Sequence, residues 1–177
     1  FKEASKKLIS KLKIKKKSRV LDIGSNDGTL LEFFKKKDFH VTGIEPAKPA
    51  SKISKSKGIN TIQAFFNLQT INKHSLNKKN FHLIVANNVF ANIDNINSWM
   101  RNIKKILSPD GVFVFESSYL YDVVFNNVFD FIYHEHLSYF SVTSVKKLCE
   151  KHDLKLFDLD HISTKGGSIR YYISKNK

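Results

Sequence analysis

Several residue types are scarce in this 177-residue chain, and each scarcity narrows what the protein can be. A single cysteine, Cys149, excludes an intrachain disulfide and a cysteine-rich zinc site, and its apolar helical surroundings predict a buried structural thiol. No hydrophobic run approaches the roughly 20 residues that cross a bilayer, and residues 1–10 lack the apolar block of a signal peptide. We therefore expect a cytoplasmic protein with no membrane partner.

Arginine is scarce as well, although the net charge is +14. Of the 30 lysine and arginine residues only Arg19, Arg101 and Arg170 are arginine. Surfaces that read nucleic acids tend to use the bidentate fork of arginine, whereas abundant Lys, Asn, Ile and Phe together are typical of drift toward A/T-rich codons. A nucleic-acid partner is therefore disfavoured, while an anionic small substrate would also be attracted by this charge.

A glycine-rich turn follows the first apolar run, in the stretch VLDIGSNDGTLL at residues 20–31. The first four residues predict a strand buried on both faces. Gly24 and Gly28 permit a tight turn with close ligand approach, and Thr29 can cap the helix that follows. A dinucleotide site requires glycine at the first, third and sixth positions, but Asn26 and Thr29 occupy the third and sixth. The dinucleotide class is therefore excluded.

The pattern has an acid, Asp22, two residues before the first glycine, followed by GSNDG. It resembles the first motif of the class I S-adenosylmethionine (SAM) methyltransferases, with Asn26 in place of the middle glycine. The resemblance implies that Asp22 lies near the methionine ammonium and that the glycine backbone passes beneath the cofactor. An acid is then expected at the end of the next strand, about 20 residues on, and Glu45 stands there, with two oxygens for the two ribose hydroxyls. The cofactor residues implied are Asp22, Gly24, Asn26, Asp27, Gly28, Glu45, Pro46, Phe65 and Asn87.

Strand and helix patterns alternate along the rest of the chain. Residues 1–17 predict an amphipathic leading helix with a basic end, and 96–107 carry the clearest helical stripe, capped by Asp94 or Asn95. A turn is expected at 108–111. The predicted strands are 20–23, 40–45, 59–64, 81–86, 112–116, 154–159 and 168–173. The alternation followed by a closing strand pair predicts one α/β domain over 1–177, with a Rossmann-like, seven-stranded, mostly parallel sheet and helices on both faces.

Residues 119–140 form an aromatic insert between the fifth strand and the last helix. Eight of these 22 residues are aromatic, and neither a period of 2 nor one of 3.6 holds. Because the insert leaves the carboxyl end of a strand, it must pass over the same edge as Asp22, Glu45 and Asn88, where open parallel sheets bind their ligands. We expect it to form the lid and the acceptor pocket.

The insert contains the tetrad Tyr133, His134, Glu135 and His136. A zinc-protease motif would need histidine at position 138, where Ser138 stands, so that class is excluded. A metal bound by the two histidines lacks an evident third ligand, so no metal is predicted, and a buried structural cluster is a further alternative. General-base chemistry is favoured, because imidazole titrates near neutrality and an adjacent carboxylate or phenol can orient it.

Six segments, in order, resemble the SAM-dependent sugar C-methyltransferases that methylate C-3 of nucleotide-linked 4-keto deoxyhexoses. The segments, which span roughly residues 18–172, are VLDIGSNDGTLL, GIEP, ANNVFANI, GVFVFESSYL, FDFIYHEHLSYFS and GGSIR. The resemblance implies that His136 is the base, that Tyr133 and Glu135 are its pocket partners, and that Asn88 positions the substrate. A ketone makes the neighbouring proton removable, so the base forms an enolate that takes the sulfonium methyl in line.

The chain departs from that family in two residues and in extent. Asn92 and Lys165 stand where the family usually has histidines, which removes a proton donor and adds a cation near the acceptor. The family's N-terminal cysteine-rich zinc module and its C-terminal domain have no counterpart in these 177 residues, so we expect the catalytic domain alone. Two alternatives stay open: an O- or N-methyltransferase whose tetrad only shapes the pocket, and a basic, non-enzymatic module that binds nucleic acid.

Overall fold

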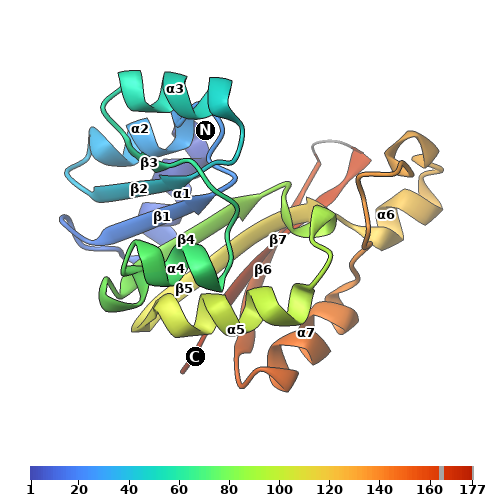
Figure 1. Cartoon of the computed structure of the whole chain (residues 1–177). Coiled ribbons are helices and arrows are strands. Elements are labelled where there is room, and N and C mark those ends of the chain that lie inside the picture. The colour runs from blue at the N-terminus through green and yellow to red at the C-terminus, as the bar shows by residue number, and fades with distance from the viewer. Residues whose placement is uncertain (164–165, 177) are drawn as a thin grey trace.

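The computed structural model describes residues 1–163 and 166–176, and in this part of the chain seven strands form one sheet (Figure 1). The strands are β1 (Arg19–Ile23), β2 (His40–Ile44), β3 (Asn60–Ile62), β4 (Phe81–Asn87), β5 (Leu107–Ser118), β6 (Lys155–Ile162) and β7 (Ser168–Ser174). Their order is β3-β2-β1-β4-β5-β7-β6, and β7 runs antiparallel to both of its neighbours. This topology confirms the predicted Rossmann-like fold.

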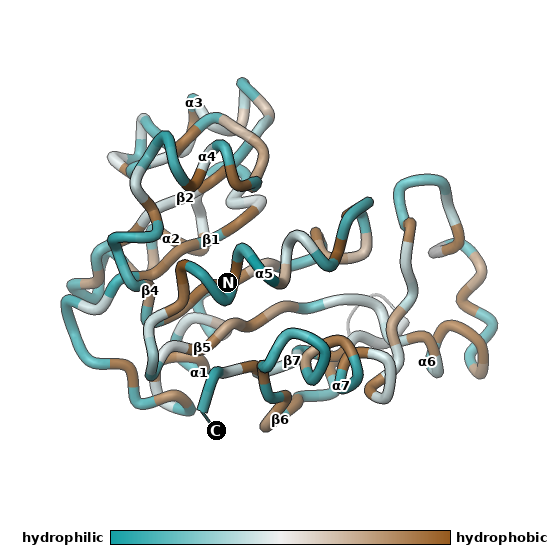
Figure 2. The backbone as a smooth tube through the Cα atoms, turned by 60° about the horizontal axis from the view of Figure 1, so that its bottom comes forward, coloured by the Kyte–Doolittle hydropathy of each residue, from teal (hydrophilic) through white to brown (hydrophobic). Residues whose placement is uncertain are grey.

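Helices cover both faces of the sheet. They are α1 (Lys2–Leu12), α2 (Thr29–Lys35), α3 (Lys48–Ser56), α4 (Leu68–Lys73), α5 (Ile96–Ile106), α6 (Leu120–Phe125) and α7 (Val142–Lys151), with short 3-10 turns η1 (Leu76–Lys78), η2 (Phe90–Asn92) and η3 (Phe129–Phe131). One apolar cluster joins the sheet to α4, α5 and α7, and a second joins it to α1 and α2. Hydrophobic residues follow the central strands, and they also follow the peripheral α6 (Figure 2). No described helix is long and apolar enough to cross a membrane.

The start of α5 agrees with the sequence prediction, and the start of α2 corrects it. Asn95 caps α5, because its Oδ1 accepts from the Ser98 N–H at 2.9 Å, and Ser141 caps α7 in a capping box. The sequence predicts Thr29 as a cap, but this residue is the first of α2. The N-cap residue is Gly28, which has no side chain, and the Asp27 carboxylate before it accepts from the Thr29 N–H at 3.1 Å.

The predicted turn at 108–111 is wrong, because β5 already begins at Leu107. In the pairing of β4 with β5, Phe81 lies opposite Leu107 and Leu83 lies opposite Val112, so β5 carries extra residues that are taken up as a bulge. Gly111 belongs to this bulge, and a Cβ there would lie 2.6 Å from the Phe81 carbonyl oxygen. The proline and glycine that suggest a turn serve the bulge instead.

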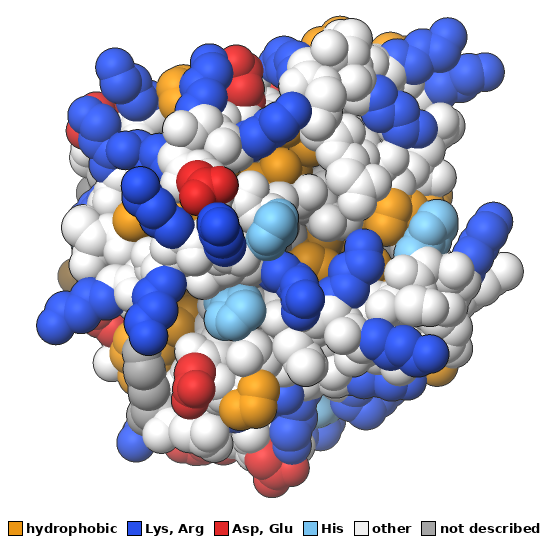
Figure 3. All heavy atoms as spheres, turned by 90° about the vertical axis from the view of Figure 1, so that its left-hand side faces the viewer, with side chains coloured by type: hydrophobic (Ala, Val, Ile, Leu, Met, Phe, Trp, Pro, Cys, Tyr) orange, Lys and Arg blue, Asp and Glu red, His pale blue; other side chains and the backbone are white. Residues whose placement is uncertain are grey.

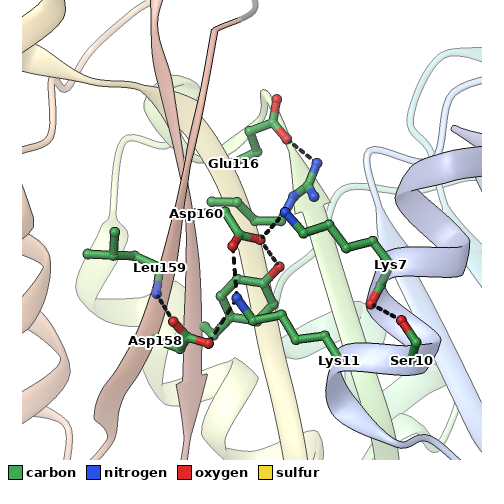
Figure 4. Close-up of polar contacts among 9 residues, drawn as sticks. Lys7, Ser10, Lys11, Glu116, Asp158, Leu159 and Asp160 are labelled. Carbon is green, nitrogen blue, oxygen red and sulfur yellow. Dashed lines mark hydrogen bonds and ion pairs between the residues drawn. The ribbon is translucent and has the colours of Figure 1, made fainter.

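A polar network fastens α1 to the edge of the sheet (Figure 4). The Asp160 carboxylate on β6 accepts from Lys11 at 2.8 Å, pairs with Lys7 at 3.2 Å, and accepts from the Tyr172 hydroxyl at 2.5 Å. Burial alone would raise the pKa of Asp160, but the hydrogen bonds from Lys11, Tyr172 and Lys7 outweigh it and lower the pKa to about 2. Ionised Asp160 therefore holds α1 in place.

Substituting Asp160→Asn is expected to lower the melting temperature at pH 6 and to have a much smaller effect near pH 2. The folded-state pKa lies below the usual value, so the stabilisation is fully present above about pH 4 and is lost as the pH falls through about 2. Thermal unfolding at both pH values measures this. The control is Asp158→Asn, since the Asp158 side chain is 41% exposed and its pair with Lys11 should contribute little. Equal losses at both pH values would contradict the assignment.

The end of the sheet at which the parallel strands begin is rich in lysine, and Figure 3 shows these side chains spread over that face with histidines between them. A hollow of about 510 Å³ lies here. Two of the cations that border it bind carbonyl oxygens of the fold: Arg19 donates to Lys79, and Lys35 donates to Gly58 at 2.8 Å. These two cations therefore donate hydrogen bonds to backbone carbonyl groups of the protein itself.

Candidate active site

A cavity of about 940 Å³ opens at the carboxyl ends of β1, β2 and β4. Its wall includes eight of the nine residues expected to bind the cofactor, and also the predicted substrate residue Asn88. The eight are Asp22, Gly24, Asn26, Asp27, Glu45, Pro46, Phe65 and Asn87. Gly28 is the exception. It is buried, and a Cβ there would lie 2.4 Å from the Ser54 hydroxyl, so this glycine lets α2 pack closely against α3.

The turn after β1 brings backbone close to the cavity. The N–H groups of Gly24 and Ser25 both donate to the Ile44 carbonyl oxygen, at 2.8 and 3.1 Å, which ties the turn to the end of β2. Gly24 has φ +73°, and a Cβ would lie 2.4 Å from Val89 Cγ2. A larger residue would therefore push the turn away from the wall that faces it.

Two buried acids stand side by side at the ends of β1 and β2. Glu45 is held by backbone donors, since its Oε2 accepts from Asn26 at 2.9 Å and its Oε1 accepts from Ala47 at 2.8 Å. Asp22 is 4% exposed. Burial, together with the charge of Glu45, raises the pKa of Asp22 to about 8. A ligand that places a cation beside Asp22 would relieve this cost.

The other polar wall residues differ in what they can offer a ligand. The Asp27 carboxylate pairs with Lys57 and with Thr29, each at 2.8 Å, and these bonds lower its pKa, so it serves mainly to stabilise the turn. Asn87 differs, because its Oδ1 is buried and accepts no hydrogen bond from any residue within 1–163 or 166–176. A buried acceptor of this kind needs a donor, and a ligand in the cavity can supply it.

The aromatic insert is closed at its base and anchored beside the cavity. Tyr119 pairs with Phe140, and the Leu120 N–H donates to the Phe140 carbonyl at 2.9 Å. Shortly before Phe140, the N–H groups of Leu137 and Ser138 donate to the Ala91 carbonyl oxygen, at 2.9 and 3.1 Å. Ala91 belongs to η2, whose next residue, Asn92, lines the cavity.

Within the tetrad, Tyr133 and His136 are in contact. The Tyr133 hydroxyl lies 3.1 Å from His136 Nε2, and the two ring centroids are 4.3 Å apart. His136 is half-buried, whereas Tyr133, His134 and Glu135 are exposed. None of the four is among the residues that line the cavity. The tetrad directly precedes Leu137 and Ser138, whose N–H groups bond to Ala91 of η2.

Sequence reasoning missed the part of the wall that α5 provides. Trp99 and Asn102 line the cavity, although the stripe of α5 indicates a packing helix only. The asparagine-rich stretch at 87–95, which leads into this helix, is a sequence feature that could have indicated that α5 begins at the cavity. Lys165 lies outside the described residues. Among those that are described, no group of three or more His, Cys, Asp or Glu side chains could hold a metal ion.

The strand order with an antiparallel β7, the glycine turn after β1 and the acids at the ends of β1 and β2 define a class I SAM-dependent methyltransferase. A family model described as a methyltransferase domain matches residues 2–159, so the chain belongs to this family. The cofactor of this family is SAM. The site fits it, because the free acceptor on Asn87, the buried carboxyl of Asp22 and the close backbone at Gly24 suit a cationic, nucleoside-containing ligand.

One curated relative is similar in sequence, and two solved structures share the fold. The chain is 35% identical over 150 residues to the C-methyltransferase NovU of Streptomyces niveus, covering 85% of this chain and 36% of that protein. It resembles a Burkholderia thailandensis 1,6-didemethyltoxoflavin-N1-methyltransferase with bound S-adenosylhomocysteine (SAH), at TM-score 0.68 and 14% identity over 99% of this chain and 77% of that one. It also resembles the magnesium protoporphyrin IX methyltransferase of Synechocystis PCC 6803 with bound SAH, at TM-score 0.69 and 11% identity over 97% and 80%.

Proposed function

We propose that this chain transfers a methyl group from SAM to a carbon of a nucleotide-linked keto sugar, through an enolate formed by His136. The contact that supports this most directly is the one between the Tyr133 hydroxyl and His136 Nε2, at 3.1 Å, in a segment anchored to Ala91 beside the donor cavity. The NovU relative adds support, because its name specifies methylation of carbon, although the chain spans only 36% of its length.

On the donor side, each residue has a distinct task in this proposal. Asp22 binds the ammonium group of the donor, and its carboxyl becomes ionised as that group arrives. Glu45 keeps lone pairs for the ribose hydroxyls while two backbone N–H groups fix its position. Asn87 accepts a hydrogen bond from SAM through its Oδ1. Phe65, which is 73% exposed, covers the adenine. SAM itself supplies an electrophilic methyl group.

On the acceptor side, the sugar lies between the cavity and the insert. His136 removes the proton next to the ketone, and the phenol of Tyr133 orients the imidazole and can exchange a proton with it. Asn88 has φ +54° and its N–H donates to the Glu116 carbonyl at 2.9 Å, which fixes its backbone at the rim and leaves its side-chain amide for the acceptor. Glu135 is the exposed carboxylate of the acceptor pocket, which the sugar and its nucleotide cover.

The position of the transferred methyl group tests this function. The chain is incubated with SAM labelled with ¹³C in the methyl group and with a nucleotide-linked 4-keto deoxyhexose, and the product is examined by ¹³C NMR. We expect the label on the ring carbon next to the ketone, because the enolate takes the methyl group on carbon and the carbonyl re-forms. Label on oxygen or nitrogen would contradict the proposal and establish the O- or N-methyltransferase alternative. Absence of transfer in a sample that binds SAH would also contradict it.

A further inference from the structure

An imidazole–carboxylate pair lies at the base of the insert, apart from the tetrad and from the residues that line the donor cavity. Asp122 on α6 has a side chain that is 10% exposed, and its Oδ2 lies 2.6 Å from Nε2 of His161 on β6. The His161 side chain is 58% exposed. The two residues are 39 positions apart in sequence, so the pair joins the insert directly to the edge of the sheet.

The turn before β7 is shaped around this carboxylate. Gly167 has φ +120°, and a Cβ there would lie 2.1 Å from Asp122 Oδ2. Gly166 has φ +74°, and its Cβ would lie 2.7 Å from Val128 Cγ1, also in the insert. The Gly167 carbonyl oxygen accepts from the Tyr119 N–H at 3.2 Å. The two glycines therefore form a seat that fits the insert closely.

Polar anchors matter here because the insert buries little apolar surface. Val124, Phe125 and Phe129 are 61%, 66% and 77% exposed. Of the insert side chains that the structure describes, only Val123 and Phe140 are buried hydrophobic ones. Apolar burial is the main stabilising contribution elsewhere in the fold, so its shortage leaves the position of the insert to the bonds at its two supports.

We infer that Asp122 and His161 are positioning residues, which hold the insert on the seat formed by Gly166 and Gly167 and so fix the tetrad at the rim of the cavity. The inference rests on the proposed function, because it assigns the pair a role in methyl transfer. The tetrad lies between two supports, at this seat and at Ala91. Removal of His161 leaves the buried Asp122 carboxylate without its imidazole, and removal of Asp122 takes away the side chain that holds α6 to β6.

The test compares substitutions that break the bond with substitutions that keep it. Asp122→Ala and His161→Ala are expected to lower kcat at least about tenfold, to leave the affinity for SAH unchanged, and to speed hydrogen–deuterium exchange in residues 119–140 while β1 and β4 stay protected. Asp122→Asn and His161→Gln retain a hydrogen bond and should restore most of the rate. Asp130→Ala, at an exposed acid of the same insert, is the control.

The exchange measurement does not depend on catalysis, so it separates this inference from the proposed function. Unchanged exchange in the insert of both alanine variants would overturn the inference whatever the reaction is. Faster exchange with an unchanged kcat would overturn the positioning role and leave the proposed function intact. If the wild-type chain transfers methyl to oxygen or nitrogen, the proposed function fails, while slow exchange restored by Asp122→Asn still supports the anchoring by this pair.

Discussion

Substitution of His136→Gln is expected to lower the rate of methyl transfer about 10²- to 10⁴-fold, which is the usual contribution of a general base. Glutamine has a similar reach and can hydrogen-bond to the Tyr133 hydroxyl, but it cannot take a proton at neutral pH. Because His136 lies outside the lining of the donor cavity, the affinity for SAH should not change. Initial rates with saturating SAM, together with calorimetric titration of SAH, measure both quantities.

The neighbouring histidine provides a matched control. His134 is exposed, and its ring centroid lies 6.4 Å from that of Tyr133. The substitution His134→Gln therefore makes the same replacement of imidazole by amide, two positions away from His136. We expect it to retain most of the rate. Equal losses in the two variants would point to general damage to the insert, and an unaffected His136→Gln enzyme would exclude an essential base at this position.

Binding of SAH is expected to tighten as the pH rises, by up to about tenfold per pH unit between about pH 5.5 and about pH 7.5. The reason is Asp22, whose pKa is raised to about 8 by burial and by Glu45. We propose that the ammonium group of the ligand lies beside this carboxylate, so binding requires the ionised form, which is the minor form below pH 8. Binding near neutral pH should therefore release about one proton.

Calorimetry in two buffers with different ionisation enthalpies measures the released proton directly. Asp22→Asn should bind SAH much more weakly, with no proton release and no such dependence on pH. The variant also tests the direction of the pKa shift of Asp22 in the free protein. A carboxyl whose pKa is raised makes the folded protein less stable as the pH rises from about 4 through 8. Ligand-free Asp22→Asn should thus be more stable than wild type at pH 8. A flat affinity profile in the wild type would contradict this account.

The sheet could be predicted from the sequence because its signals are local. Short apolar runs such as 81–86 favour a buried strand, and their alternation with helical stripes favours a parallel sheet. The carboxyl ends of those strands then lie along one edge, so the amino-acid sequence alone places Asp22, Glu45 and Asn88 near one another. The cavity contains all three.

The features that escaped prediction depend on contacts between distant parts of the chain. The bulge of β5 uses the same proline and glycine as a turn, and only its pairing with β4 tells the two apart. The insert has no periodic pattern from which its structure could be predicted. Its position depends on bonds to Ala91 and His161, which are distant in sequence. The cavity-facing side of α5 could not be predicted, because Trp99 belongs to the apolar stripe that packs against the core and also lines the cavity.

Exchange of a single hydrogen atom tests the proposed chemistry most directly. In D₂O, with SAH in place of SAM, methyl transfer cannot occur, but a base at the insert can still remove the proton next to the ketone of the sugar and return deuterium. We predict that the wild-type chain incorporates deuterium at that carbon and that the His136→Gln variant does so at no more than the uncatalysed rate. Equal incorporation by both proteins, or none by the wild type, would contradict the role assigned to His136.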